Sequence, residues 1–225
     1  MTGYPRARAS ALPSASLTLG DYLTQRNYSP GFIEDHILPL CVALWSTTVE
    51  RARELPLAFV LDFMDRHHLL QFEGRPDWLV VEGGSNRYVS AFVDAFKGDL
   101  RLSSPVLKVE RNPGFVRLRT REGEHRFDRV VFACHADQAL SLIDPSPQES
   151  EILSAFQYNT CRAVVHSDES FMPTQSRAWS SWNVLGNDHR DLRLTLWLNR
   201  LQSLGSDKNF FVTLDPAREP AHLWA

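Results

Sequence analysis

The 225-residue sequence carries 24 basic and 27 acidic residues, a formal net charge of -3, and 43% hydrophobic residues. This balance supports a folded core and gives no electrostatic reason to expect a nucleic acid or an anionic membrane as partner. The three cysteines, Cys41, Cys134 and Cys161, are widely spaced and odd in number, which argues against a disulfide framework and favours a reducing cytoplasm. No apolar run reaches the roughly 20 residues of a membrane-spanning helix. Residues 1–16 lack a continuous apolar stretch and are expected to form a loose tail.

The next part of the sequence predicts helices. Thr18 can cap a first turn, and Ser29 and Pro30 supply a cap followed by proline at the first helical position. Apolar residues then recur every three or four positions, with Pro39 expected to kink or interrupt the run. Pro56 begins another helix, whose expected apolar face consists of Phe59, Val60, Phe63 and Met64.

The pattern then changes from helical spacing to short strands. Residues 78–81 form an apolar, strand-like run that ends at Gly83 and Gly84, and residues 86–96 return to helical spacing. Residues 130–134 form an unbroken apolar run typical of a strand covered on both faces, which requires neighbouring strands. Between them, alternation predicts a three-stranded meander at residues 106–110, 115–120 and 125–127.

The last part of the sequence predicts one helix and an antiparallel sheet. The helix is expected at residues 148–156, after a proline-containing turn cluster at residues 144–147. The strand-prone segments are residues 162–167, 177–184, 192–198 and 210–214, with a polar turn at residues 186–188. The order of elements therefore predicts a mixed fold, α+β or mixed α/β, with a helical cluster, a meander beside a covered strand, and a final antiparallel sheet.

Three blocks of sequence occur in an order that resembles the central region of flavin amine oxidases and phytoene desaturase-like enzymes. They read VVEGGSNRYV at residues 80–89, SPVLKV at residues 104–109 and FDRVVFACHA at residues 127–136. A second set is similar to a bacterial branch of flavin oxidoreductases associated with fatty-acid cyclopropane synthases. This set reads VFACHADQ at residues 131–138, SSWN at residues 180–183 and LWLNRLQ at residues 196–202.

The resemblance implies the substrate-side domain of a two-domain, FAD-dependent, amine oxidase-like fold. Residues 17–78 would form the helical part of the substrate domain, and residues 146–225 its antiparallel sheet. Residues 79–145 would form a partial FAD-binding region, containing the Gly-Gly turn, a helix, the meander and the covered strand. The FAD-binding domain is expected to be incomplete, because the 225 residues contain no G-x-G sequence to hold the pyrophosphate.

Two positions acquire candidate roles from the resemblance. Val106 matches the place where the chain passes the adenine of FAD, so its backbone N–H and C=O would bind the base. The simpler alternative is that Val106 is an inward residue of a meander strand. Arg87 matches a substrate-side position that is glutamine in a well-known member, and a guanidinium would favour a carboxylate over a protonated amine. The alternative for the preceding Gly83-Gly84-Ser85 is an ordinary connection between a strand and a helix, in which the glycines permit the turn and the serine caps the helix.

The final sheet contributes further candidate substrate-binding residues. In the family a sheet at this place lines the cavity over the flavin, which makes Trp182 and Trp197 candidate walls for an apolar substrate. The alternative is that these tryptophans simply belong to the core. No catalytic residue can be assigned. The His67-His68 pair gives no metal site, because adjacent helical residues point in different directions.

The function implied for the full-length protein is hydride transfer from a C–H of a small apolar substrate, such as a lipid acyl chain, to FAD. The sequence in hand is expected to be a fragment of such an enzyme that binds FAD weakly or not at all. The alternative function is a non-catalytic module that binds a lipid or a protein partner, derived from such an enzyme.

Overall fold

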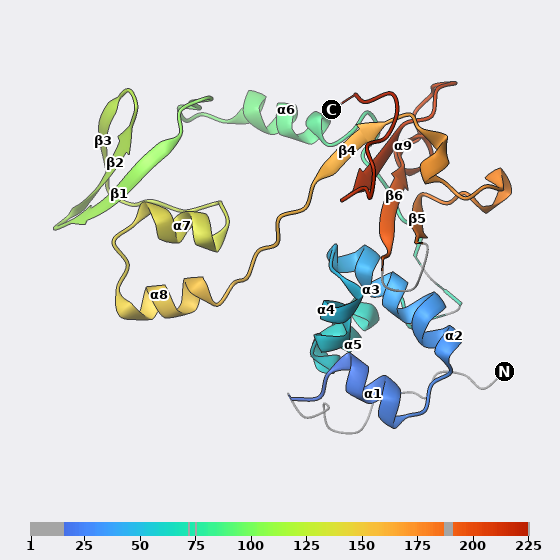
Figure 1. Ribbon diagram of the computed structural model, residues 1–225. Helices are drawn as coiled ribbons and strands as arrows, with labels where there is room; N and C mark the ends of the chain where they lie inside the picture. Colours follow the sequence, from blue (N-terminus) through green and yellow to red (C-terminus); the bar gives the residue numbers. More distant parts are fainter. Residues whose placement is uncertain (1–15, 72, 75, 187–190, 225) are drawn as a thin grey trace. The chain divides into compact units, whose positions relative to one another are not determined.

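A computed structural model describes residues 16–224 except for residues 72, 75 and 187–190 (Figure 1). The expected loose tail at residues 1–16 lies outside the described residues except for Ser16, and the expected turn at 186–188 lies outside them except for Gly186. The described chain divides into two units. The first contains the residues up to Ser90 and those from Cys161 onward, and the second contains residues 91–160. No helix in the described part is long and apolar enough to cross a membrane.

The first unit begins with a cluster of short helices, as the sequence predicts. Thr18 Oγ1 accepts a hydrogen bond from the Asp21 N–H at 3.1 Å, and Ser29 Oγ accepts one from the Phe32 N–H at 3.2 Å, so both predicted caps are confirmed. The helices are α1 (Leu19–Gln25), α2 (Pro30–Phe32), α3 (Leu38–Trp45), α4 (Val49–Glu54) and α5 (Leu57–Arg66). The expected interruption by Pro39 takes the form of a π-helical turn, η1 (Ile33–Ile37), which joins α2 to α3. This wider turn relieves the clash of a proline ring with the carbonyl one turn earlier.

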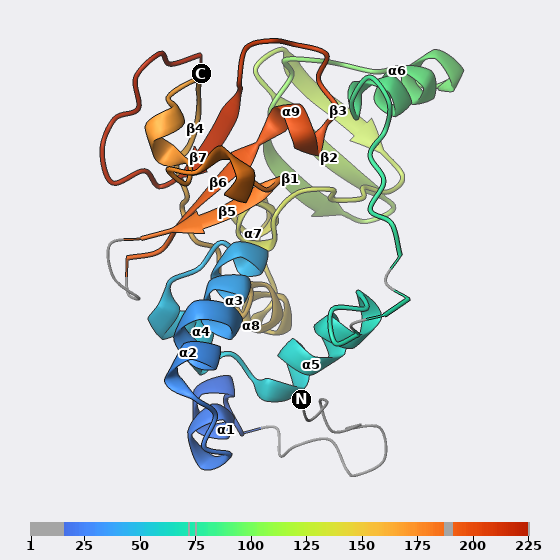
Figure 2. The ribbon, with the colours of Figure 1, turned by 90° about the vertical axis from the view of Figure 1, so that its right-hand side faces the viewer.

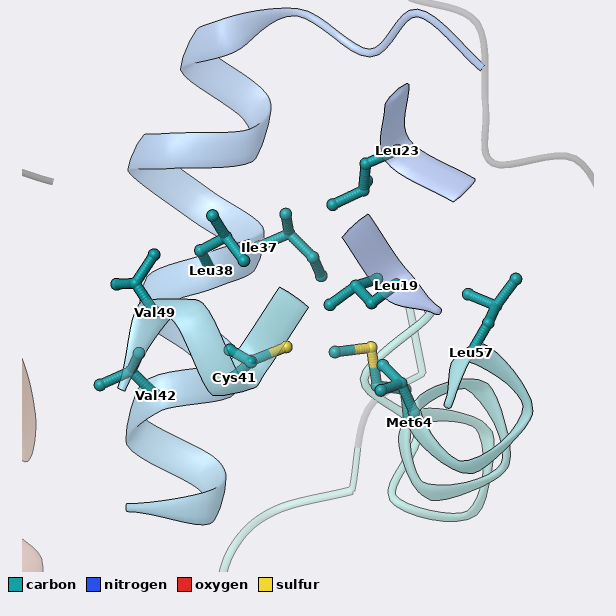
Figure 3. Packing of buried hydrophobic residues seen from close by; sticks show 11 residues of the cluster. Leu19, Leu23, Ile37, Leu38, Cys41, Val42, Val49, Leu57 and Met64 are labelled. Carbon is teal, nitrogen blue, oxygen red and sulfur yellow. The ribbon is translucent and has the colours of Figure 1, made fainter. Parts of the chain in front are cut away.

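The helical cluster surrounds a core of buried apolar side chains (Figure 3). Leu38, Leu57 and Val60 are each 1% exposed, and the Cys41 thiol points from α3 toward Met64 of α5. The expected apolar face of α5 is partly wrong, because Phe59 is 47% exposed and Leu57 is buried instead. Leu57 follows the capping Pro56, and its N–H donates to the Leu17 carbonyl, which draws this end of the helix into the core.

The reactivity of the three thiols should follow their burial. Burial raises the pKa of Cys41 to about 12, whereas Cys134 is exposed. Because the thiolate is the nucleophile, Cys41 should react with iodoacetamide at least about 100-fold more slowly than Cys134 in the folded protein. Peptide mapping by mass spectrometry measures both rates, and denaturant should equalise them. Equal labelling of the two cysteines before denaturation would contradict the helical core described here.

The second element of the first unit is a four-stranded antiparallel sheet, as predicted (Figure 2). Its strands are β4 (Ala163–His166), β5 (Trp182–Leu185), β6 (Arg193–Trp197) and β7 (Phe211–Leu214), in the order β4-β7-β6-β5. The strand expected at residues 177–184 begins only at Trp182. The preceding segment forms two 3-10 turns, η2 (Glu169–Phe171) and η3 (Ser176–Ala178), and a short helix, α9 (Leu198–Leu201), follows β6.

The second unit contains the predicted meander, whose strands are β1 (Val106–Asn112), β2 (Phe115–Thr120) and β3 (Gly123–Phe127). The predicted helix near residue 148 is confirmed as α8 (Pro147–Ser154), but α7 (Ala136–Leu142) was not expected from the sequence. Arg111 of β1 binds Glu149 of α8 through two hydrogen bonds of 2.7 and 2.9 Å. Arg111 and the hydrogen bonds from the Ser146 backbone and hydroxyl together lower the pKa of Glu149 to about 2, and the ion pair fixes the start of α8 against the meander.

Two predicted strands are wrong. Residues 78–81 and 130–134 have no strand structure, and Leu79 and Val131 are 88% and 90% exposed. An apolar run becomes a doubly covered strand only when strands pair with it on its edges, and the described residues provide no such partner. The predicted helix at 86–96 is confirmed as α6 (Asn86–Ala95), which crosses from the first unit into the second. Its apolar face is nevertheless exposed, at Val89, Phe92 and Val93.

Candidate functional site

The four-stranded sheet has two chemically different faces, which its register defines. Residues paired directly across antiparallel strands lie on the same face. Trp182 pairs with Leu196, and Leu196 pairs with Val212. Val212 in turn pairs with Val165. These four residues form an apolar face together with Ala163, Val184, Leu194 and Leu214. The apolar face carries no charged side chain, and of its eight residues only Leu194 is fully buried.

The opposite face carries a buried row of polar side chains: Asn183, Thr195, Thr213 and His166. All four are at most 5% exposed. His166 Nε2 lies 2.8 Å from Thr213 Oγ1, which lies 2.9 Å from Thr195 Oγ1. The Asn183 amide donates to the Thr195 carbonyl at 3.3 Å. Because a buried polar group without a partner costs about 1–3 kcal/mol, this connected row specifies one register for all four strands.

Trp182 and Trp197, both predicted as substrate-binding residues, lie on opposite faces of the sheet. Trp182 belongs to the apolar face and is 46% exposed. Trp197 pairs with Phe211 on the side of the polar row. Its indole N–H donates to Asn209 Oδ1 at 3.0 Å, and its ring meets Trp179 edge-on at 5.3 Å. Trp197 therefore packs within the protein, whereas the Trp182 ring remains partly exposed to solvent.

Arg87 lies in the first turn of α6 and is exposed. Its guanidinium makes no hydrogen bond or ion pair within the described part of the chain. The side chain folds back over Gly83, where an added Cβ would stand 2.7 Å from Arg87 Nε. Gly83 also has a φ of +76°, a conformation that glycine adopts at no steric cost. The absence of a side chain at Gly83 thus leaves space for the Arg87 guanidinium.

Val106 belongs to the second unit, whereas Arg87, Trp182 and Trp197 belong to the first. It is the first residue of β1 and pairs with Thr120, while Lys108 pairs with Arg119. Leu107 is therefore an extra residue in the ladder, which is the mark of a β-bulge. A bulge leaves backbone groups outside the strand ladder, where they can bind a ligand.

Sequence reasoning missed most of the apolar face and the whole polar row. The alternation of residues in β6 and β7 was the available signal, since it separates Leu196 and Val212 from Thr195 and Thr213. His166 carries no such signal, because a single histidine in a strand has many ordinary explanations. Among the residues that the structure describes, no three His, Cys, Asp or Glu side chains gather closely enough to hold a metal ion.

Comparison with known families decides the ancestry of this fold. The family model described as flavin containing amine oxidoreductase matches residues 27–221, most of the chain. The chain belongs to this family. Its members are oxidoreductases that use a flavin cofactor. No curated protein matches the chain.

Solved structures with a similar fold share little sequence with this family member. A putative protoporphyrinogen oxidase from Exiguobacterium sp. is 15% identical with a TM-score of 0.61, over 93% of this chain and 47% of its own. A fatty acid isomerase from P. acnes, described as producing CLA, is 12% identical with a TM-score of 0.56, over 92% and 47%. A putrescine oxidase mutant is 12% identical with a TM-score of 0.61, over 89% and 44%. The chain thus has the mixed helix and sheet fold of FAD-dependent amine oxidases but spans just under half the length of these proteins.

The residues of this chain do not by themselves fit a whole FAD. A dinucleotide of this kind needs backbone N–H groups at a glycine-rich turn to bind its pyrophosphate, and the sequence contains no G-x-G. The bulge at Val106 leaves backbone groups outside the strand ladder. The flavin is the cofactor of the family's full-length members.

Proposed function

We propose that the whole protein is an FAD-dependent oxidoreductase that takes a hydride from a C–H of an apolar substrate of the acyl class. The observation that carries this proposal is the apolar face of the sheet, with its half-exposed Trp182 and no charged side chain. Binding an acyl chain there would remove that surface from water, at roughly 25 cal/mol per Å². FAD would accept the hydride when bound, and the sheet would hold the chain and exclude water.

The second feature proposed for the substrate is a carboxylate, which would bind to the guanidinium of Arg87. A guanidinium without a partner in the described chain can bind a carboxylate through two parallel hydrogen bonds, and it would repel a protonated amine. A fatty acid isomerase occurs among the structural neighbours, so a fold of this kind accommodates an acyl chain. The motifs at residues 131–138, 180–183 and 196–202 support placing this chain in the branch associated with fatty-acid cyclopropane synthases.

The cofactor contact proposed for this chain is the backbone of Val106, which would bind the adenine beside the bulge in β1. Since the sequence contains no G-x-G turn to bind the pyrophosphate, the chain alone should bind FAD weakly or not at all. Titration of the purified chain with FAD, followed by flavin fluorescence, measures this. Tight binding in a one-to-one ratio would overturn this assignment of the binding groups.

Replacing Arg87 with glutamine should separate the two substrate features. In the full-length flavoprotein, Arg87→Gln should raise KM for a fatty acid by about 10- to 100-fold, because a charge-assisted hydrogen bond contributes about 1.5–3 kcal/mol. The KM for the alcohol of the same chain length should stay unchanged, since it offers no carboxylate. Trp182→Ala should weaken both substrates alike. Anaerobic bleaching of the flavin absorbance by each substrate measures these effects.

The matched control is Phe59→Ala, which removes an equally exposed aromatic ring, 47% against 46% for Trp182, from the helical cluster. It should leave both substrates unaffected. If Trp182→Ala and Phe59→Ala behave alike, the apolar face is not the substrate wall. If the chain binds fatty acids but the full-length protein never reduces its flavin with them, the oxidoreductase proposal fails and the lipid-binding module takes its place.

A further inference from the structure

The outer edge of β4 is closed by the last described residues of the chain, 218–224, here called the strap. Leu223 forms an antiparallel bridge with His166. The Trp224 N–H donates to the Val165 carbonyl at 2.8 Å, and the Ser167 N–H donates to the His222 carbonyl at 3.2 Å. The strap thus pairs with β4 like a short additional strand, on the side opposite to β7.

The Asp168 carboxylate connects the strap to the turn after β4, where the Trp224 indole N–H also donates to Ser167 Oγ at 2.9 Å. Asp168 Oδ2 accepts hydrogen bonds from the Ala221 N–H at 3.0 Å and from Arg218 at 3.2 Å. Its other oxygen accepts from the N–H and the hydroxyl of Ser170. Asp168 can hold the strap only while the backbone of residues 166–168 keeps its present conformation.

That conformation depends on the protonation of His166. The Asp168 N–H donates to His166 Nδ1 at 3.1 Å, so Nδ1 must be the unprotonated nitrogen. Nε2 therefore carries the proton and donates to Thr213 Oγ1. A second proton could bind only at Nδ1, where it would face the Asp168 N–H as donor against donor. The imidazole is completely buried, so a conformational change is needed to bring bulk water to this contact.

We propose that protonation of His166 releases the strap from the edge of β4. The second proton breaks the hydrogen bond to the Asp168 N–H, and the turn that presents the Asp168 carboxylate to Ala221 and Arg218 is lost with it. The neutral ring keeps the strap closed. This device lies on the side of the sheet opposite to the apolar face, so it stands independently of the proposed function.

The charged groups around His166 act in opposite directions. Burial lowers the pKa of His166, and the nearby Arg218 lowers it further, while the Asp168 carboxylate raises it. The other rings packed on the imidazole, Phe171 and Phe211, are uncharged. Because the folded-state pKa is lowered, the closed strap is fully stable above the ordinary imidazole pKa of about 6.5. Its stability decreases as the pH falls below that value.

Hydrogen exchange of individual amides tests the device in the intact chain. Between pH 7.5 and 5, the protection of the Trp224 and Ser167 amides should fall by about tenfold relative to the Trp197 and Leu198 amides, which are bonded to backbone carbonyls at the end of β6. The ratio cancels the pH dependence of intrinsic exchange. A ratio that stays constant over this range would overturn the proposal.

Substitutions identify the titrating group that makes the protection of the strap depend on pH. In His166→Asn the amide oxygen can still accept from the Asp168 N–H but cannot titrate, so the protection ratio should become independent of pH. His222→Gln and Glu219→Gln, which change the strap's own titratable groups, should retain the wild-type pH dependence. Loss of the dependence in either would refute the assignment to His166. Should His166→Asn fail to fold, an NMR titration of the His166 ring must give the same midpoint as strap opening, and a different midpoint would refute the proposal.

Discussion

Replacing Phe211 with alanine is expected to lower the free energy of unfolding by about 3–5 kcal/mol, as large aromatic deletions in closed cores do. Phe211 is completely buried at the start of β7, the strand between β4 and β6. Its ring lies 5.6 Å from the His166 ring and 5.8 Å from the Trp179 ring. Removing it would leave a cavity beside the polar row, where the surrounding strands are fixed by their own hydrogen bonds and cannot close the space.

Urea denaturation of the two proteins, followed by circular dichroism, measures this loss. The control is Phe92→Ala, which removes a ring that is 66% exposed and should cost less than about 1 kcal/mol. Equal losses for the two variants would mean that the four-stranded sheet does not form a core of its own. The measurement thus tests whether the sheet, which positions Trp182, is the stable part of the first unit.

Replacing Asp168 with alanine should cost about 2–4 kcal/mol, because several donors lose their shared acceptor at once. The Asp168 side chain is 11% exposed, and Arg218, Ala221 and Ser170 all donate to it. Arg218 also lies over the Phe171 ring, 4.3 Å from its centroid, so loss of the carboxylate leaves this guanidinium without its anionic partner. The strap should then exchange its amide protons rapidly at every pH.

The pH dependence of this contribution follows from the direction of the pKa shift. Burial by itself raises the pKa of Asp168, but the N–H groups of Ala221 and Ser170, the Ser170 hydroxyl and Arg218 together hold the pKa well below its usual range. The stabilisation is therefore complete above the ordinary carboxyl pKa of about 3.9 and is lost as the pH falls through the lower folded-state value. The loss expected for His166 begins at a higher pH, as the pH falls below the ordinary imidazole pKa of about 6.5.

Asp62→Ala is the matched control for this carboxylate. Asp62 pairs with Arg66 one helical turn away, and both side chains are largely exposed. Solvent screens such a pair, so its loss should cost about 0.3–0.5 kcal/mol or less. A similar cost for Asp62→Ala and Asp168→Ala would show that the Asp168 cluster does not hold the strap, and it would remove the structural basis for the pH-dependent release.

Local interactions made much of the fold predictable. Ser29 caps a helix because its hydroxyl reaches the N–H three residues later, and Asn112, Pro113 and Gly114 turn the chain between two strands because glycine permits a φ of +78°. The three blocks at residues 80–89, 104–109 and 127–136 were enough to indicate the flavin amine oxidase family. Each of these inferences needs only residues close together in the sequence.

The strands at residues 78–81 and 130–134 could not be decided in that way. Their apolar composition suits a strand covered on both faces, but a strand exists only when another segment satisfies its backbone groups, and the described chain brings no such segment to them. The apolar composition of a segment indicates that it suits a buried environment. It does not show whether a neighbouring strand is present to pair with its backbone.

For the candidate site, too, some features follow from the sequence and others only from the tertiary structure. The sequence by itself determined that the chain has an aromatic, antiparallel sheet and an arginine next to a Gly-Gly turn. Only the tertiary structure decided that Trp182 and Trp197 face opposite ways and that the polar row lies buried while the apolar face stays half open. It also decided that the strap closes over Asp168. The reason is physical, since pairing register sets the face on which every strand residue lies, and register arises from contacts between residues far apart in the sequence.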